Sequence, residues 1–279
     1  MTKITERRPL HETDGAHIQH LVRRRDGDNN RRAQAQISLI EELRPDVFLM
    51  QEAKAFDANG GALLYQLEAS IGMRGFLAVA PRTGQNVAIF IREPLRPLSF
   101  EVDGANFHHV LAKLKIALPG IESVFTLIST HLCPNGAAVR RREAAYLSVH
   151  AAEDGYSLLT GDFNSVSPHD PEPEGFEMLP VHHRARYLSE DLRTADRSVL
   201  AQLEAAGWVD IGHALGGSGI PTAPTAGFIN TEFAVMRCDY ILASKALAAC
   251  ATSYKVLCTP VTDMASDHYP AVSTFEVTR

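Results

Sequence analysis

Side chains that can bind a metal ion or move a proton stand next to short apolar segments along this chain. Each lies just before or just after such a segment, and they are Glu52, His131, Asp162, Asn164, Asp239, Asp267 and His268. Short apolar segments of this kind are typical of buried strands. Because strand ends can meet at one rim of a sheet, we expect these residues to lie together in the folded protein.

This set of residue types favours one kind of chemistry. It contains carboxylates, two histidines and an asparagine but no cysteine, and carboxylates suit Mg²⁺ or Mn²⁺ better than Zn²⁺. A divalent ion neutralises charge on phosphoryl oxygens, a carboxylate orients water, and imidazole or amide donors hold the remaining oxygens. The set therefore favours metal-assisted hydrolysis of a phosphate ester.

Every one of these residues also has an ordinary structural explanation. Asp162 and Asn164 come directly after Gly161, where both types commonly form turns. Glu52 could be an exposed carboxylate at the end of a strand, and His131 could be a buried, hydrogen-bonded histidine. Asp239 and His268 could likewise serve only structural hydrogen bonds. These explanations apply to single positions and weaken when several such residues occur in one order.

The elements that must position these residues are readable from apolar spacing. Ala33, Ile37, Ile40 and Leu43 recur at helical spacing, and Pro45 ends that helix. Further helices are predicted at 63–72, 136–152 and 198–206. Strands are predicted at 47–50, 76–79, 87–91, 98–102, 110–118, 124–130, 156–159, 209–211, 240–243, 252–258 and 271–277. Residues 165–195 and 212–231 read as long loops, which are often functional.

The chain divides into a short first segment and one long unit. Residues 1–30 are polar and lack periodicity, so we expect an irregular or altered N-terminal segment. Residues 31–279 contain no internal repeat and no linker, so we expect a single domain there. Mixed strands and helices predict a sheet-rich α/β sandwich.

Composition excludes several classes of protein. The chain has 279 residues, 45% of them hydrophobic, and a formal net charge of −6. That balance is typical of globular proteins and argues against a strongly basic nucleic-acid coat. The four cysteines form no C-x-x-C motif, the N-terminus has no apolar secretory core, and no apolar run could span a membrane. We therefore expect a cytoplasmic protein, and the oligomeric state is left open.

Five short motifs, taken together and in order, resemble one enzyme superfamily. They are PDVFLMQEA at 45–53, STHLCP at 129–134, LTGDFNS at 159–165, RCDYILAS at 237–244 and SDHYPAV at 266–272. In this order they are similar to the endonuclease/exonuclease/phosphatase superfamily, which includes pancreatic-type deoxyribonuclease and exonuclease III. The resemblance runs from about residue 31 to residue 277. It implies a four-layer αββα sandwich with two mainly antiparallel or mixed sheets.

The resemblance also implies an activity and its metal ligands. The expected activity is divalent-metal-dependent hydrolysis of phosphate esters, most simply by a phosphodiesterase or nuclease that uses in-line attack by water. Glu52 resembles the principal metal ligand of the family, and Asp267 resembles a second carboxylate at the metal. The implied cofactor is Mg²⁺ or Mn²⁺. The implied partner is a phosphate ester, which includes nucleic acid bound without sequence specificity.

The remaining motif residues resemble the catalytic groups of the family. His268 is similar to the histidine that contacts phosphate or activates water, and Asp239 to the aspartate that orients it. Asp162 is similar to the carboxylate that positions the attacking water. Asn164 and His131 are similar to the two residues of the family that donate hydrogen bonds to the phosphate.

Two arginines are candidate substrate-binding residues, since a guanidinium presents a rigid fork of donors to phosphate. Arg142 lies in the predicted helix after His131, and Arg237 lies two residues before Asp239. The alternatives are a solvated helix face for Arg142 and an ion pair for Arg237. His108 and His109 lack metal-ligand spacing and read as loop or strand-end residues.

The N-terminus departs from the pattern of the family. Members usually begin with a strand that ends in an asparagine, and nothing in residues 1–30 clearly matches it. Residues 16–22 could take its place, with Gln19 or His20 as the polar group, or the recorded start could be displaced. This departure keeps two alternatives open. One is an impaired or non-catalytic binding protein on the same scaffold, and the other is an enzyme that redeploys the site for non-phosphate chemistry.

Overall fold

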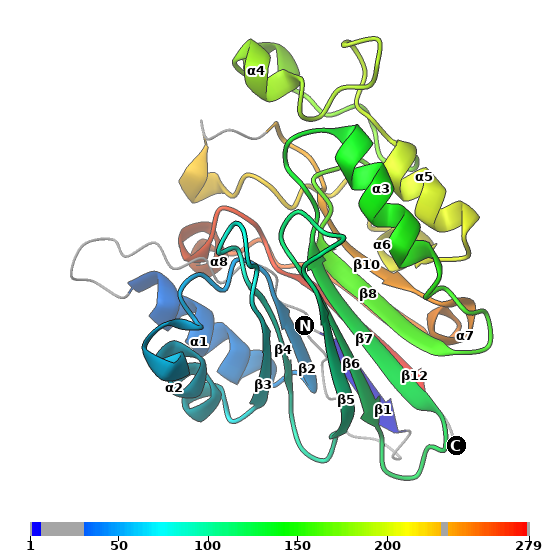
Figure 1. The fold of residues 1–279 in the computed structure, drawn as a ribbon. Helices are drawn as coiled ribbons and strands as arrows, with labels where there is room; N and C mark the ends of the chain where they lie inside the picture. Colours follow the sequence, from blue (N-terminus) through cyan, green and yellow to red (C-terminus); the bar gives the residue numbers. More distant parts are fainter. Residues whose placement is uncertain (1, 7–30, 230–233, 278–279) are drawn as a thin grey trace.

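Two β-sheets packed face to face, with helices on both outer surfaces, make up the fold (Figure 1). The computed structural model describes residues 2–6, 31–229 and 234–277. Within these residues each sheet has six strands and is mixed, with one parallel pair among antiparallel neighbours. The four-layer αββα sandwich predicted from the motifs is confirmed.

The first sheet positions Glu52, Asp267 and His268 of the candidate site. Its strand order is β11-β12-β1-β2-β4-β3. The strands are β1 (Thr2–Glu6), β2 (Val47–Met50), β3 (Arg74–Ala78), β4 (Val87–Ile91), β11 (Ala251–Val256) and β12 (Ala271–Val277). Strand β2 is buried over its whole length and is bordered by β1 and β4. The residues that follow Met50 therefore lie at the end of an interior strand of this sheet.

The second sheet carries most of the predicted catalytic residues. Its order is β5-β6-β7-β8-β10-β9, with β7 and β8 parallel. The strands are β5 (Arg96–Asp103), β6 (Leu111–Ala117), β7 (Val124–His131), β8 (Tyr156–Asp162), β9 (Val209–Asp210) and β10 (Asp239–Ala243). In β6 burial alternates along part of the strand, since Leu114 and Ile116 are buried while Lys115 is exposed.

Helices cover the outer face of each sheet. Ile40 of α1 and Leu67 of α2 pack with Phe48 and Phe90 of the first sheet. Helices α3 and α5 lie over the second sheet, where Leu147 packs in one cluster with Ile128 and Leu159. The helices are α1 (Arg31–Leu43), α2 (Ala62–Ile71), α3 (Ala137–Ser148), α4 (Val181–Arg184), α5 (Ser198–Ala205), α6 (Ile211–Ala214), α7 (Lys245–Ala248) and α8 (Pro260–Ala265), with 3₁₀ turns η1 (Ala58–Gly61), η2 (Phe176–Met178) and η3 (Ala226–Phe228).

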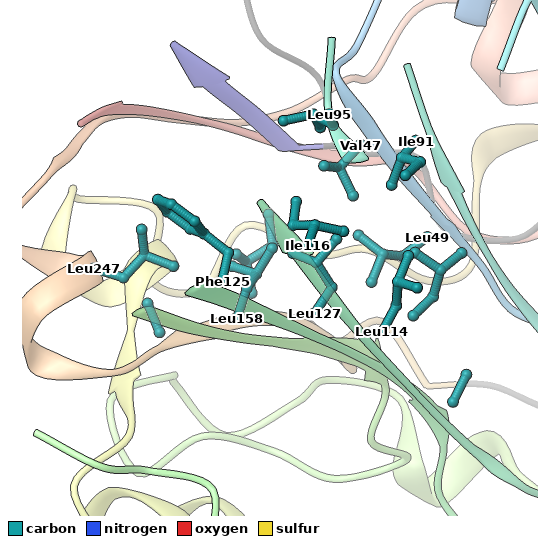
Figure 2. Close-up of a cluster of buried hydrophobic side chains, with 14 of the residues drawn as sticks. Val47, Leu49, Ile91, Leu95, Leu114, Ile116, Phe125, Leu127, Leu158 and Leu247 are labelled. Carbon is teal, nitrogen blue, oxygen red and sulfur yellow. The ribbon is translucent and has the colours of Figure 1, made fainter. Parts of the chain in front are cut away.

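The core lies between the two sheets. Figure 2 shows Val47, Leu49 and Ile91 of the first sheet facing Leu114 and Leu127 of the second. All are essentially excluded from solvent. Burying a side chain of this size stabilises the fold by roughly 1.5–3 kcal/mol. The paired sheets thus give a rigid platform whose strand ends carry the polar residues.

The N-terminal strand corrects one expectation. Residues 1–30 were predicted to be irregular, but Thr2–Glu6 forms β1, which pairs in parallel with β12 and contacts β2 at Thr2. The strand was missed because Ile4 is the only apolar residue among Thr2–Glu6, so neither an apolar run nor an alternation marks it. The hypothesis that residues 16–22 supply this strand falls outside the described residues, and so do Gln19 and His20.

No helix in the described ranges combines the length and the apolar character needed to cross a membrane.

Candidate active site

The register of three neighbouring strands brings three of the predicted residues side by side. Parallel pairing of β7 with β8 sets His131 opposite Asp162, and antiparallel pairing of β8 with β10 sets Asp162 opposite Asp239. Gly161 allows this close approach, because a Cβ there would overlap the carbonyl oxygen of Thr130 on β7. Three chemically active residues therefore lie side by side at one edge of the second sheet, formed by the last residues of β7 and β8 and the first residue of β10.

Asp162 lies at the centre of this edge and is almost completely buried. Its Oδ1 accepts a hydrogen bond from the backbone N–H of Asn164 at 2.8 Å, and Nδ2 of Asn164 lies 3.3 Å from Oδ2. Nε2 of His131 is also 3.3 Å from Oδ2. Asn164 is held in the left-handed region (φ 47°), where few residues other than glycine occur. Several donors thus converge on one carboxylate, a geometry that orients it firmly.

Asp239 and His268 form a buried pair. Nδ1 of His268 lies 2.8 Å from Oδ2 of Asp239, and the backbone N–H of Asp239 donates to Oγ1 of Thr222 at 3.2 Å. Burial alone lowers the pKa of the imidazole, but the adjacent Asp239 carboxylate outweighs it and raises the pKa of His268 well above its usual value. The pair fixes the orientation of the ring, as expected for an Asp–His couple.

Glu52 lies just beyond β2 in a strained backbone conformation (φ 53°). Its side chain is 17% exposed and lies 3.1 Å from Nζ of Lys54. The preceding residue, Gln51, is buried and donates through Nε2 to Oγ of Ser129 on β7 at 3.0 Å. This bond joins the two sheets next to Glu52, so the carboxylate is held close to the ends of the second-sheet strands.

Asp267 is held between Ser266 and His268 in the segment before β12. Oδ1 of Asp267 lies 3.6 Å from Nη2 of Arg32 on α1, and its carbonyl accepts from the backbone N–H of Thr225 at 3.0 Å. The guanidinium of Arg32 is itself buried and stacks over Phe228. Sequence reasoning missed Arg32, because an arginine early in a helix carries no signal of such a contact.

Glu52 and Asp267 are suitable ligands for a hard divalent cation. Their side chains are partly open, at 17% and 28% exposure, whereas Asp162 and Asp239 are buried. Both supply carboxylate oxygens, the donors that Mg²⁺ and Mn²⁺ prefer. Each carboxylate is paired with a cationic side chain, Lys54 or Arg32, which a bound metal ion would have to displace. In donor type and in exposure the two residues therefore suit the predicted metal.

His109, which the sequence indicated only as a loop or strand-end residue, lies in a loop beside His131. Its ring centroid lies 4.5 Å from that of His131, and its Nδ1 lies 2.8 Å from Oγ1 of Thr83. Burial, with smaller contributions from the neighbouring histidines, lowers the pKa of His109 to about 2, while Glu52 acts in the opposite direction. His109 is therefore a neutral ring that packs against His131 and lies within the electrostatic influence of Glu52.

Arg237 corrects a second expectation. It was a candidate for substrate binding, but its guanidinium is buried and forms ion pairs with Asp170 and Asp210 at distances of 2.7 to 2.9 Å. It also stacks over Tyr240 at 4.5 Å from the ring centroid. Two carboxylates and an aromatic face occupy its donors, so Arg237 is a structural anchor. The alternative of an ion pair is the correct one.

The arginines at the start of α3 differ from one another. Arg142, the predicted phosphate contact, is exposed on the helix. Arg140 is fully buried and donates to Oγ of Ser165 at 2.9 Å and to the carbonyl of Cys133 at 3.1 Å. Arg140 therefore supports the segments that follow β7 and β8, next to His131 and Asn164. Contact between Arg142 and a substrate stays a prediction.

Contacts within the described residues connect the predicted catalytic and metal-binding residues. On one side Glu52 acts electrostatically on His109, which packs against His131, and His131 contacts Asp162. On the other side Asp162 lies opposite Asp239, whose partner His268 adjoins Asp267. The structure therefore places these residues around the ends of strands that belong to both sheets.

The comparisons with known proteins concern the family and the fold. The profile of the Endonuclease/Exonuclease/phosphatase family matches residues 18–268. An AP endonuclease from Archaeoglobus fulgidus is similar in structure, with a TM-score of 0.67 and 22% identity over 94% of this chain and 100% of that one. A mannosyl-6-phosphatase from Bacteroides thetaiotaomicron has a TM-score of 0.65 at 14% identity, covering 93% and 98% of the two chains.

A DNA complex is also among the similar structures. It is D. rerio TDP2 complexed with a single-strand DNA product, with a TM-score of 0.64 and 19% identity over 95% of this chain and 100% of that one. At these identities the likenesses show a shared fold. The search of curated proteins finds no match.

Proposed function

Because the chain belongs to the Endonuclease/Exonuclease/phosphatase family, we propose that it is a divalent-metal-dependent hydrolase of phosphate esters. The proposed reaction is in-line attack of water on the phosphorus atom of a phosphodiester, as in a phosphodiesterase or nuclease. The observation that best supports this proposal is that buried Asp162 lies opposite Asp239, which forms a buried pair with His268. Such convergence of acids and imidazoles is typical of hydrolytic sites.

We assign the metal to Glu52 and Asp267, with Mg²⁺ or Mn²⁺ as the ion. A divalent ion bound there would polarise the phosphoryl group and neutralise its charge. Family membership supports this assignment, since the superfamily generally depends on divalent metals. The two carboxylates also have the partial exposure that a ligand for an exchangeable ion requires.

Asp162 orients the attacking water in this proposal. Its carboxylate is fixed by Asn164 and contacts His131, so one oxygen can hold a water in line with the scissile bond. His131 donates to the phosphate oxygens. The amide Nδ2 of Asn164 donates to the carbonyl of Leu132 at 3.0 Å and lies 3.3 Å from Asp162, so it reaches the phosphate by giving up one of these contacts. His268, held by Asp239, faces the same phosphate and offers its Nε2 as a donor. Oriented donors of this kind stabilise charge that develops in the transition state.

The substrate class is narrowed by composition and by the similar structures. A net charge of −6 disfavours tight, sequence-specific binding of DNA. Similar structures include an AP endonuclease and a complex of TDP2 with single-strand DNA. We propose a nucleic-acid phosphodiester, gripped through few phosphates and without sequence specificity, as the first substrate to test.

A small hydrolysis panel tests the proposal. The panel contains supercoiled plasmid, single-strand DNA, a chromogenic phosphodiester and a phosphomonoester, each with Mg²⁺, with Mn²⁺ or with EDTA. We expect metal-dependent turnover that is lost in Asp162→Ala. Exposed Asp154→Asn, in the turn before β8, is the matched control and should keep full activity. Absence of turnover from folded wild-type protein on every member would instead favour a non-catalytic scaffold or a different chemistry.

A further inference from the structure

A cysteine thiol lies against the buried Asp239–His268 pair. Sγ of Cys238 is 3.5 Å from Oδ2 of Asp239 and 3.7 Å from Nδ1 of His268, and those two atoms are 2.8 Å apart. The sulfur, oxygen and nitrogen atoms of the three side chains thus form a cluster of possible metal ligands. The proposed phosphate chemistry assigns no task to this thiol.

Backbone hydrogen bonds hold these three residues in place. The carbonyl of Cys238 accepts from the N–H of Phe163 at 2.8 Å, and its N–H donates to Oγ1 of Thr222 at 3.1 Å. The N–H of His268 donates to Oγ of Ser266 at 3.2 Å. All three side chains are essentially inaccessible to solvent. The geometry is therefore a fixed property of the fold and not a surface coincidence.

The separations match those of ligands around a tetrahedral zinc ion. Zn–S bonds are about 2.3 Å and Zn–N and Zn–O bonds about 2.0 Å, so tetrahedral angles place sulfur about 3.5 Å from each lighter ligand. Cys238 already has such separations, at 3.5 and 3.7 Å. Nitrogen and oxygen would stand about 3.3 Å apart around zinc, so Nδ1 and Oδ2 need to separate by about half an ångström.

We propose that Cys238, Asp239 and His268 form a second metal site, specific for a thiophilic divalent cation such as Zn²⁺, and that its occupation blocks hydrolysis. Binding forms bonds from the metal to Sγ, Oδ2 and Nδ1. The thiol proton and the Nδ1 proton of His268 leave to solvent, and no electron is transferred. This site differs from Glu52 and Asp267, which supply only hard oxygen donors.

The inhibitory effect follows from the loss of the Asp–His hydrogen bond. A metal on Nδ1 and Oδ2 replaces the proton that links His268 to Asp239, and so turns the imidazole away from its catalytic position. This part of the inference rests on the proposed function, whereas metal binding does not. Because bound ligands must lose protons, affinity should fall as the pH falls.

Cobalt absorption tests binding without any reference to activity. Co²⁺ titrated into the metal-free full chain should give a thiolate-to-cobalt charge-transfer band with one equivalent, and Zn²⁺ should abolish it. Cys238→Ser should lack the band and bind Zn²⁺ at least about 100-fold more weakly, since even outer-shell changes cost 10–100-fold. Cys258→Ser, which removes an exposed thiol, is the matched control and should retain the band. A wild type without the band, or a band that persists in Cys238→Ser, would overturn the site.

Inhibition is measured with saturating Mg²⁺ present. Zn²⁺ should inhibit wild type and Cys258→Ser alike, and Cys238→Ser should require at least about 10-fold more Zn²⁺. Equal inhibition of all three proteins would refute the inhibitory role. A protein that gives the cobalt band but hydrolyses no phosphate ester would refute the proposed function and leave the metal site standing.

A second variant protects the test from a folding failure. If Cys238→Ser does not give the far-UV circular dichroism of wild type, Cys238→Ala is titrated in its place, since it buries no additional hydroxyl. His268→Gln also removes one ligand and keeps the thiol. It should retain a weakened band, and an unchanged cobalt affinity in this variant would exclude His268 from the site.

Discussion

Two of the residues assigned to the site have a backbone conformation that ordinary side chains avoid. Glu52 and Asn164 have φ angles of 53° and 47°, and each follows the last residues of a strand. Non-glycine residues in this region cost about 1–3 kcal/mol and tend to cluster at functional sites. Asn164 is kept there by the carboxylate of Asp162. The side chains of Glu52 and Asn164 are thus held in place at a cost in stability.

His109 makes the free energy of unfolding depend on pH in the acidic range. Its pKa is about 2 in the folded chain and about 6.5 when unfolded, so below pH 6.5 only the unfolded chain binds the proton. Stability conferred by the neutral ring is therefore present above about pH 6.5 and lost as the pH falls. For one such group the loss between about pH 7.5 and about pH 5 is about 2 kcal/mol.

Urea unfolding at several pH values measures this effect. His109→Gln should lack that part of the acid dependence, so its free energy of unfolding should approach that of wild type as the pH falls. Exposed His182→Gln is the control and should follow wild type throughout. A His109→Gln variant with the acid dependence of wild type would contradict the assignment of a neutral buried ring.

At the scale of elements, the site depends on how closely β7 and β8 approach. Gly161 lies opposite Thr130, one residue before His131 and Asp162 pair. Gly161→Ala places a methyl group against the Thr130 carbonyl, so the strand ends must separate. We expect a loss of about 1–3 kcal/mol in the free energy of unfolding and a larger fractional loss of kcat than of KM.

Gly155→Ala is the matched control for this prediction. A Cβ at position 155 meets no atom nearer than 3.7 Å, so its effect on unfolding should be small. Both variants are compared by urea unfolding and by steady-state kinetics on the best substrate of the panel. Equal stability and activity of the two variants would show that the close approach at Gly161 is dispensable.

Arg237 joins three separate parts of the second sheet. It pairs with Asp170 in the long loop after β8 and with Asp210 at the start of α6, and it stacks on Tyr240 of β10. Arg237→Gln leaves two buried carboxylates without their cation. We expect a loss of about 3–5 kcal/mol in the free energy of unfolding.

The control is an ion pair at the surface. Lys245→Gln removes an exposed pair with Glu153 and should change unfolding by less than about 1 kcal/mol. At a temperature where Arg237→Gln is folded, its KM should equal that of wild type, because the guanidinium is enclosed by protein. A raised KM without loss of stability would restore Arg237 as a substrate-binding residue.

At the scale of the whole molecule, binding of the proposed metal should stabilise the fold. A ligand present at 100 times its Kd stabilises the folded state by about 2.7 kcal/mol. Mg²⁺ or Mn²⁺ should therefore raise the melting temperature of wild type, and Glu52→Gln should lose most of that increase. Glu42→Gln, on the exposed face of α1, is the control and should respond as wild type does. Equal responses of Glu52→Gln and wild type would place the metal elsewhere.

Most of the sandwich could be predicted from the sequence, because its strands are buried and regular. Val47–Met50, Val87–Ile91 and Ala271–Val277 have the bounds expected from their apolar runs. Strand β1 was missed, since its only apolar residue is Ile4 and it therefore contains no apolar run. The motif residues were found because each follows or precedes such a run.

Contacts between distant segments could not be predicted in the same way. The ion pairs of Arg237 and the packing of His109 on His131 depend on register and loop paths, which local patterns do not encode. Arg140 illustrates the same limit, since three successive arginines look alike in sequence and only one is buried. Sequence therefore identified the residues of the edge better than their neighbours.

The most direct test of the central claim is the fate of the attacking oxygen. The best substrate of the panel is hydrolysed in ¹⁸O-labelled water with Mg²⁺, and both products are analysed by mass spectrometry. Attack of an Asp162-oriented water on phosphorus predicts one ¹⁸O in the phosphate product and none in the alcohol. It also predicts a fall in rate of about 10²–10⁴-fold in Asp162→Asn. Label in the alcohol, or full metal-dependent turnover by Asp162→Asn, would contradict the account.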